Sequence, residues 1–416
     1  MQNNIQCSFC NSTTMRMIMD FGSMALAGGF LEEKSFATEP SYKMRLYFCE
    51  SCFAVQIIDK INEEELFQDY FYFSSSIKTL SSHFKSHAEQ IVKQFFPSPK
   101  EAKVMEFGCN DGILLRPLSN LGIGTLIGVD PASNVVNQID IPNVSIVNDF
   151  FNEETAKTII KNYGYLDMVL ANNVYAHISD IQGITKAIES VLKEDGIFIF
   201  EVHYLDKIIN EMQYDMIYHE HIYYHSLLSL ENHFNIYNMK VFNVEPIPIH
   251  AGSMRYYVCK KGSTYEKEVS DSVRALKEEE LTKGFNSFAT FSDFADKVKD
   301  QKYQLMSCLD EIKSQGKTIA GYGASGRANT IIQYCGINHT HLEYLIDDSP
   351  AKQGYYTPGS HFSIKSSEIL RTNPPDYILV FAWSFLEEIA NKNKDYFDLG
   401  GKMIVPLPDV KIIGNK

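Results

Sequence analysis

The sequence lacks any run of apolar residues near the ~20 that a membrane-spanning helix needs. Its first residues, MQNNIQCSFC, also lack the basic and then apolar order of a secretory signal peptide. Basic residues are the scarcer charged class, 38 against 52 acidic residues, and the formal net charge is −14. A chain with this charge repels polyanions overall. We therefore expect a soluble, cytoplasmic protein that binds neither a membrane nor nucleic acid.

Hydrophobic residues make up 44% of the 416-residue chain and charged residues 22%, a balance typical of globular proteins. The chain is longer than one ordinary domain, since domains hold roughly 100 to 200 residues. We expect three domains, over residues 1–75, 76–261 and 262–416. The predicted fold class is α/β, because short apolar runs alternate with helical stretches in the second and third segments.

Four of the eight cysteines form two close pairs, Cys7 with Cys10 and Cys49 with Cys52. This spacing allows paired thiolates to bind one tetrahedral zinc ion, although the gap between the pairs is longer than in most zinc ribbons. A site closed by four thiolates has no open coordination position, so the zinc would be structural. Four free thiols are the alternative. We expect the first ~75 residues to form a small irregular unit that needs such a metal site for its stability.

Five apolar runs in the second segment have the length and composition of buried strands. They are KVMEFGC, TLIGVD, VSIVNDF, LDMVLANN and GIFIFEV, and helical stretches between them predict an open parallel sheet. MKVFNVEPI and SMRYYVCK can add an antiparallel hairpin at its edge. Residues 262–315 predict a helical bridge. Four later runs, KTIAGYGA, LEYLIDD, DYILVFAW and KMIVPLP, predict a second, smaller doubly wound domain.

A glycine-rich turn between a strand and a helix occupies residues 104–118, VMEFGCNDGILLRPL. Gly108 and Gly112 allow the backbone to approach a ligand closely, and the helix start presents free N–H groups. Asp130 ends the next strand about 20 residues further on, where an acid can accept both ribose hydroxyls. The spacing differs from a G-x-G-x-x-G dinucleotide loop. An ordinary structural turn with surface acids is the alternative.

EFGCNDG resembles the first motif of the class I methyltransferases that use S-adenosylmethionine (SAM). The resemblance implies that Asp149, after the third strand, lies near the adenine, and that Asn172 lies beside the cofactor and the substrate. The full set of cofactor-binding residues that it implies is Gly108, Asn110, Asp111, Gly112, Asp130, Asp149, Phe150 and Asn172.

The densest group of titratable residues is Tyr218, His219, Glu220 and His221. Two imidazoles beside a carboxylate and a phenol can supply a base, an orienting group and a hydrogen-bond donor. The pattern favours a catalytic segment. A second metal site and a polar surface loop are the competing interpretations.

Together these motifs resemble the sugar C-3 methyltransferases, which act on nucleotide-linked deoxysugar intermediates of antibiotics and bacterial surface glycans. The resemblance spans nearly the whole chain. It is carried by the cysteine pairs and by YFSSS, EFGCNDG, ANNVYAHISD, EVHYL, IYHEH, HAGSMRYYV, GYGASGRANT and DDSPAKQGYYTPGSH. Two positions depart from the family pattern, Ala251 in HAGS and His203 in EVHYL. They bear on the identity of the acceptor more than on the reaction.

The resemblance implies a small zinc-binding N-terminal domain and a class I SAM methyltransferase (Rossmann-like) middle domain. It further implies a second, smaller Rossmann-like C-terminal domain that holds a nucleotide-linked keto-sugar. Active-site roles would fall on Tyr72, His177, Tyr218, Glu220 and His221.

The implied reaction is methylation of C3 beside a C4 ketone, because loss of the α-proton leaves an enolate that attacks the sulfonium methyl group. His221 would be the general base, since imidazole with its ordinary pKa of ~6.5 is largely neutral at cytosolic pH. Glu220 would orient a neighbouring group. Tyr218 and His177 would donate hydrogen bonds to the enolate oxygen, and Tyr72 would close the site.

The second glycine-rich turn, GYGASG, offers N–H groups and Ser325 to a diphosphate, and Arg327 adds positive charge. Its alternative role is only to pack a helix on a strand. Ser253 is a further expected substrate-binding residue.

An O- or N-methyltransferase acting on a small molecule or sugar is the nearest competing function, and it needs a base but no ketone. A binding protein whose cysteine unit contacts RNA or a protein partner is a different class. The acidic balance and the absence of a basic, aromatic-interleaved stretch disfavour it. The oligomeric state stays open, with a monomer as the simplest expectation.

Overall fold

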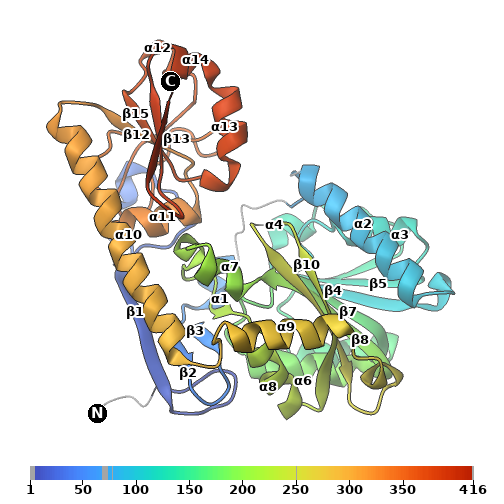
Figure 1. Cartoon of the computed structure of the whole chain (residues 1–416). Coiled ribbons are helices and arrows are strands. Elements are labelled where there is room, and N and C mark those ends of the chain that lie inside the picture. Colours follow the sequence, from blue (N-terminus) through green and yellow to red (C-terminus); the bar gives the residue numbers. More distant parts are fainter. Residues whose placement is uncertain (1–4, 68–73, 77, 250, 415–416) are drawn as a thin grey trace.

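The computed structural model describes residues 5–67, 74–76, 78–249 and 251–414. Within these residues the strands form three sheets of four, seven and six strands. Figure 1 shows the N-terminal strands in blue, the seven-stranded sheet among cyan to yellow helices, and the C-terminal sheet in red.

The seven-stranded sheet carries the first glycine turn, and its strand order is β10-β11-β8-β7-β4-β5-β6. Strands β4 to β8 pair in parallel, and the hairpin β10–β11 joins β8 in the antiparallel sense. The predicted parallel sheet with an edge hairpin is therefore confirmed. The strands are β4 (Lys103–Phe107), β5 (Thr125–Val129), β6 (Val144–Val147), β7 (Leu166–Asn172), β8 (Leu192–His203), β10 (Met239–Ile247) and β11 (Ser253–Lys260).

Helices cover both faces of this sheet, and its strands are therefore buried on both sides. One face packs against α5, α6 and α8 through side chains such as Ile159, Ile188 and Phe234. The other face packs against α2 and α3, through Phe84 and Leu118. The helices are α2 (Lys78–Phe95), α3 (Leu115–Asn120), α4 (Ser133–Val136), α5 (Glu153–Tyr163), α6 (Ile181–Val191) and α8 (Leu227–Ile236).

The strand order reverses between β4 and β7. The chain runs outward from β4 to β5 and β6, and then returns to add β7 and β8 on the other side. Open α/β sheets bind ligands at such a reversal, beyond the carboxyl ends of the strands. Gly108 follows β4 and Asn172 ends β7, so both lie at this point.

The N-terminal sheet is antiparallel, in the order β1 (Met15–Met24), β2 (Tyr42–Cys49), β3 (Val55–Ile57) and β9 (Tyr223–Tyr224). The expectation of an irregular N-terminal unit is therefore wrong. Register shifts between Met17 and Met19 and between Asp20 and Ser23 break the alternation by which a strand is recognised in sequence. Because β9 comes from the middle of the chain, this sheet joins two distant segments.

The C-terminal sheet has the order β14-β13-β12-β15-β16-β17, and only the β16–β17 pairing is antiparallel. The predicted second doubly wound domain is confirmed, and the sequence did not reveal β14 or β17. The strands are β12 (Ile319–Tyr322), β13 (Leu345–Ile346), β14 (Ile364–Lys365), β15 (Tyr377–Val380), β16 (Lys402–Val405) and β17 (Lys411–Gly414). The helices are α11 (Gly326–Cys335), α12 (Ile369–Thr372), α13 (Leu386–Lys392) and α14 (Lys394–Asp398).

The predicted helical bridge consists of α9 (Asp271–Thr282) and α10 (Phe288–Ser314). Helix α10 runs from the N-terminal strands to the C-terminal sheet (Figure 1). Its buried Phe291 and Leu305 belong to one hydrophobic core that also contains Ile57 of β3 and Ile404 of β16. The first and last domains therefore share a core.

Short helices link these elements. They are α1 (Glu63–Phe67), α7 (Leu205–Asn210) and the 3-10 helices η1 (Glu33–Thr38), η2 (Ser74–Ser76), η3 (Pro99–Glu101), η4 (Tyr214–Met216), η5 (Thr264–Lys267) and η6 (Trp383–Phe385). Within the described part of the chain, no helix combines the length and apolar character that crossing a membrane requires.

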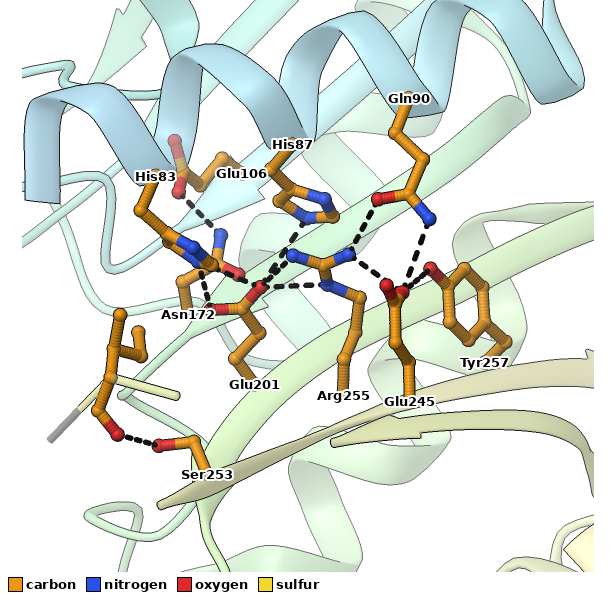
Figure 2. Close-up of polar contacts among 11 residues, drawn as sticks. His83, His87, Gln90, Glu106, Asn172, Glu201, Glu245, Ser253, Arg255 and Tyr257 are labelled. Carbon is orange, nitrogen blue, oxygen red and sulfur yellow. Dashed lines mark hydrogen bonds and ion pairs between the residues drawn. The ribbon is translucent and has the colours of Figure 1, made fainter. Parts of the chain in front are cut away.

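A row of polar side chains crosses the seven-stranded sheet beneath α2 (Figure 2). Arg255 of β11 lies opposite Glu201 of β8, with Nε 2.7 Å from Oε1, and its Nη1 donates to Glu245 at 2.9 Å. His83 of α2 reaches the same Glu201 carboxylate at 2.9 Å. Burial alone would raise the pKa of Glu201, but the hydrogen bond from His83 and the charge of Arg255 lower it to about 2. The ionised Glu201 thus anchors α2 to the sheet.

We predict that Glu201→Gln lowers the free energy of unfolding by about 3 kcal/mol, the low end of the range for breaking a buried ion pair, because the buried Arg255 charge then keeps only Glu245, whose side chain is 36% exposed. Urea denaturation followed by circular dichroism measures the change. Glu50→Gln is the matched control, since Glu50 pairs with Arg16 at 3.2 Å on the surface with 46% of its side chain exposed. Such surface pairs are worth about 0–1 kcal/mol. Equal losses in the two variants would contradict the assignment.

Candidate active site and cysteine cluster

At two positions of the turn after β4, the backbone conformation favours glycine. Gly108 and Gly112 have φ angles of 64° and 77°, a left-handed conformation that other residues rarely adopt. A Cβ on Gly108 would lie 2.7 Å from Cγ2 of Val174. Asp130 supports the turn, because its Oδ2 accepts the N–H of Asn110 at 2.9 Å. Burial raises the pKa of Asp130, and its expected ribose contact would use the remaining lone pairs of the carboxylate.

Three buried acceptor oxygens in this region have no hydrogen-bond partner among the described residues: Glu106 Oε2, Asp111 Oδ1 and Asn172 Oδ1. The other oxygen of Glu106 accepts from Asn172 Nδ2 at 3.0 Å. Burial raises the pKa of Glu106 to about 8, so this carboxyl is largely neutral near pH 7. Unpaired buried acceptors are costly unless a ligand supplies donors. The ammonium group of SAM carries three donors and a positive charge, so the acceptor set fits this cofactor.

The segment before α2 lies on this turn. The Ser74 N–H donates to Asn110 Oδ1 and the Ser75 N–H to Asp111 Oδ2, both at 3.0 Å. Both serines belong to YFSSS, which therefore reaches the cofactor turn. Tyr72 of the same motif lies outside the described residues.

Asp149 and Phe150 follow β6. Asp149 is exposed, and its Oδ1 accepts the N–H of Phe150 at 2.7 Å. Phe150 lines a cavity of about 470 Å³ together with Phe151 and Ile178. The same lining carries five acids, among them Glu63 and Asp180, and it does not include Asp149. Their role at the adenine stays a prediction.

His221 is held in one orientation by its own segment. Its Nδ1 lies 2.9 Å from the main-chain oxygen of Met216, and because a carbonyl only accepts, Nδ1 carries the proton. Its Nε2 lies 3.0 Å from the Tyr218 hydroxyl, so a neutral ring has its lone pair there. The ring of His177 meets His221 edge to face, with centroids 4.9 Å apart. Burial, and after it the neighbouring His221, lower the pKa of His177, which is therefore neutral.

This histidine pair lies at the carboxyl end of β7. The N–H groups of Ile222 and Tyr223 both donate to the main-chain oxygen of Ala176, at 2.9 and 3.2 Å. Ala176 follows Asn172 closely in the chain. His177 and His221 therefore lie over the same end of the sheet as the cofactor turn.

His219 and Glu220 point elsewhere. His219 Nε2 lies 3.3 Å from the main-chain oxygen of Lys43, so this ring ties the segment to β2. Glu220 faces the N-terminal domain, because a Cβ on Gly28 would lie 3.3 Å from its Oε1. Its carboxyl makes no hydrogen bond to described residues, and burial raises its pKa to about 7. Among the described side chains, no cluster with metal-binding geometry includes this segment, which disfavours the second metal site.

The three residues expected to bind substrate are engaged within the protein. Ser253 Oγ donates to the main-chain oxygen of Ile249 at 3.3 Å (Figure 2). Ser325 caps α11 by accepting an N–H from its first turn at 3.3 Å. Arg327 forms a bidentate ion pair with Asp215, at 2.8 and 3.1 Å. Substrate binding stays a prediction for all three.

The sulfur atoms of Cys7, Cys10, Cys49 and Cys52 all lie within 4.8 Å of one another. The Cys7–Cys52 and Cys10–Cys49 pairs are 3.5 and 3.7 Å apart. Tetrahedral zinc with bonds of about 2.3 Å needs sulfur separations of about 3.8 Å. Hydrogen bonding to Cys49, and burial, raise the pKa of Cys7 and Cys52. Since a dication would favour all four thiolates, the cluster fits a structural zinc ion.

Sequence reasoning missed Glu106 and Asp215. The sequence does mark Glu106, because an acid near the end of a buried strand, just before a glycine turn, needs a partner of its own. No local pattern in the sequence marks Asp215, since its partner Arg327 is 112 positions away and belongs to another domain.

Comparisons with known families match three consecutive parts of the chain. A family model described as a methyltransferase domain matches residues 81–244, and one described as a C-methyltransferase C-terminal domain matches residues 248–408. A third, whose description proposes a zinc binding domain, matches residues 7–67. With the cofactor turn and the cysteine cluster, these matches indicate a SAM-dependent methyltransferase.

Over 409 residues, the chain is 29% identical to the C-methyltransferase NovU of Streptomyces niveus, across 98% of this chain and 96% of that protein. A ubiquinone biosynthesis O-methyltransferase of Methylobacterium nodulans is 31% identical over 105 residues, 24% of this chain and 41% of that protein. The SAM-bound magnesium protoporphyrin IX methyltransferase of Synechocystis matches 44% of this chain and 79% of its own, with 12% identity and a TM-score of 0.33. The expected fold class, methyltransferase activity and cofactors, SAM and structural zinc, are confirmed.

We predict that Glu106→Gln weakens SAM binding by about 10- to 100-fold, since a hydrogen bond to a charged group is worth about 1.5–3 kcal/mol. The pKa of Glu106 is about 8, and a cationic ligand favours its ionised form. Binding to the wild type should therefore release a proton, and its affinity should rise with pH between about pH 6 and 7.5, below the titration of the SAM amino group. Titration calorimetry measures both.

The control for this experiment is Glu101→Gln, which changes an exposed acid of η3. It should bind SAM with the affinity and pH dependence of the wild type. If Glu106→Gln does so as well, the carboxyl has no part in the cofactor site.

We predict that Cys49→Ser removes bound zinc and lowers the thermal midpoint by about 10 °C or more, because the metal's binding free energy contributes to folding. Elemental analysis and calorimetry measure the two effects. Cys308→Ser is the control, since Cys308 is a half-buried thiol of α10 outside the cluster. A Cys49→Ser protein with one zinc per chain and the wild-type midpoint would refute the zinc site.

Proposed function

We propose that this enzyme methylates C3 of a nucleotide-linked 4-keto deoxysugar through an enolate intermediate, in the biosynthesis of antibiotic or surface-glycan sugars. One observation carries the proposal. The Met216 carbonyl holds the proton of His221 on Nδ1, so the lone pair on Nε2 faces the Tyr218 hydroxyl over the cofactor end of the sheet. SAM supplies an electrophilic methyl group, so the protein's task is to generate a carbon nucleophile. A positioned base beside hydrogen-bond donors performs this task.

His221 removes the α-proton through Nε2. The Tyr218 hydroxyl donates to that nitrogen at 3.0 Å in the protein without substrate. When substrate binds, it turns this proton to the ketone oxygen that becomes the enolate, and the Nε2 lone pair takes the α-proton. His177 is kept neutral by burial and acts as a second donor without adding positive charge. Donors of this kind are worth about 3 kcal/mol each in other enzymes.

Glu220 acts from the side of the N-terminal domain. Because its pKa is about 7, the carboxyl can either accept or donate a hydrogen bond near pH 7. It has no partner among the described residues, which leaves it available to a sugar hydroxyl. Tyr72, which lies outside the described residues, is the side chain proposed to close the site.

The nucleotide diphosphate lies at the GYGASG turn, with Ser325, and the positive charge of Arg327 lies beside it. Part of this turn is structural, because the Ala324 N–H donates to Asp347 Oδ2 at 2.8 Å. A Cβ on Gly326 would lie 3.6 Å from the ring of Tyr218, so the turn lies against the catalytic segment. A nucleotide bound there would have its sugar close to His221.

The comparisons favour carbon over oxygen or nitrogen as the acceptor atom. The relative named a C-methyltransferase is matched across 98% of this chain, whereas the O-methyltransferase is matched across 24%. O- or N-methylation of a small molecule or sugar is the competing function. It requires no ketone, so methylation of a reduced 4-hydroxy sugar would favour it.

We predict that His221→Asn lowers kcat by about 10²–10⁴-fold with SAM affinity unchanged, the usual contribution of a general base. Mass spectrometry of products from a panel of nucleotide-linked 4-keto sugars measures turnover. In deuterated solvent, with the demethylated cofactor in place of SAM, the wild type should exchange the C3 proton and His221→Asn should not.

His339→Asn is the control for this variant, because His339 is an exposed residue of the C-terminal domain. It should retain turnover and exchange. Wild-type turnover by His221→Asn would exclude this residue as the base, and methylation without any exchange would argue against a separate enolate.

A further inference from the structure

We propose that the C-terminal domain positions the general base through a clasp of Asp215, Arg327 and Trp383. Asp215 lies in η4, Arg327 in α11 and Trp383 in η6. The proposal rests on the base role of His221 in the proposed function. It adds that the proton position on His221 depends on an ion pair between two domains, in which Asp215 and Arg327 are positioning residues.

At the centre of the clasp is the buried Asp215 carboxylate, whose charge is neutralised by a side chain of another domain. Asp215 is fully buried. Its Oδ2 accepts from Arg327 Nε at 2.8 Å and from Trp383 Nε1 at 2.9 Å, and its Oδ1 accepts from Arg327 Nη2 at 3.1 Å. The guanidinium also lies over the Trp383 ring, 4.9 Å from its centre. These side-chain donors all belong to the C-terminal domain, so η4 cannot keep this charge buried without that domain.

Further contacts extend the clasp along the same segment. Thr330 of α11 donates to the main-chain oxygen of Ile217 at 3.0 Å. The Tyr214 hydroxyl donates to Gln301 of α10 at 2.8 Å. Helices α10 and α11 therefore bind three of the four residues that precede Tyr218, namely Tyr214, Asp215 and Ile217.

The path from the clasp to the base is short. Met216, between the clasped Asp215 and Ile217, provides the carbonyl that accepts the proton of His221 Nδ1 at 2.9 Å. If η4 moves, this bond is lost, and the imidazole can then carry its proton on Nε2. In that tautomer no lone pair faces the substrate, so the base is inactive although His221 is still present.

The clasp also limits the role of Arg327 as a diphosphate ligand. Two of its nitrogens are bound to Asp215, and Nη1 lies 3.4 Å from Ser384 Oγ. A diphosphate would have to share the guanidinium with a buried carboxylate. The two roles predict different kinetics, because loss of a ligand raises KM for the sugar nucleotide, whereas a misplaced base lowers kcat.

The test uses the full-length protein and the variants Asp215→Asn, Arg327→Lys and the double variant. Histidine labelled with ¹⁵N reports the His221 tautomer by NMR, with no substrate present. We expect the proton on Nδ1 in the wild type and a mixture of tautomers in each variant. With the 4-keto sugar that the wild type methylates, kcat should fall by about 10- to 100-fold, the usual effect of misplacing a catalytic group by about 1 Å. KM should change by less than about threefold, and the double variant should lose no more than the single variants.

Asp167→Asn is the matched control, because Asp167 pairs with Lys193 at 2.7 Å at the amino end of β7, the end opposite to the one that carries the histidine pair. It should keep the wild-type tautomer and kcat. If Asp215→Asn does not fold, Arg327→Lys decides the matter, since it keeps the positive charge and loses only the bidentate geometry.

Variants with the wild-type tautomer and kcat would overturn the clasp, as would a rise in KM alone. The NMR measurement also separates this proposal from the proposed function. If the wild type fails to exchange the C3 proton but the tautomer still depends on Asp215, the enolate chemistry is wrong and the clasp stands.

Discussion

Hydrogen bonds from all three domains hold the segment between Tyr214 and Tyr224, and the geometry of the candidate active site depends on them. His219 reaches the main chain of β2, and β9 adds to the N-terminal sheet. Ile222 binds the end of β7 in the middle domain. Asp215 binds Arg327 of the C-terminal domain. The side chains of this segment reach their observed positions only when the three domains are assembled, because no single domain supplies all of these bonds.

Three buried glutamates show how neighbours decide the charge of one residue type. Beside Arg255 and His83, Glu201 has a pKa of about 2 and is ionised, which ties α2 to the sheet. Burial without a cation raises the pKa of Glu106 to about 8 and that of Glu220 to about 7. The paired acid stabilises the fold. The unpaired acids lie where ligands are expected, and groups with raised pKa values are common at such sites because a bound partner can shift them back.

The strands of the two doubly wound sheets could be predicted because each is a compact apolar run between helical stretches. The cysteine pairs and the glycine turn were also visible, since their chemistry depends on spacing within a few residues. The N-terminal strands were not recognised, because two register shifts disturb their alternation. Strand β9 has only two residues and pairs with β3, far away in the chain, so no local pattern marks it.

The sequence by itself determined which residues are candidates for the chemistry: four thiols, a glycine turn, an acid after the next strand, and a segment with two imidazoles. Only the tertiary structure decided how they act. In the folded protein, His221 contacts Tyr218, His219 contacts β2, and Arg327 pairs with Asp215. The reason is physical. Residue type and spacing follow from the covalent chain, whereas proton positions and pKa values follow from burial and from partners that the fold brings together over long distances in sequence.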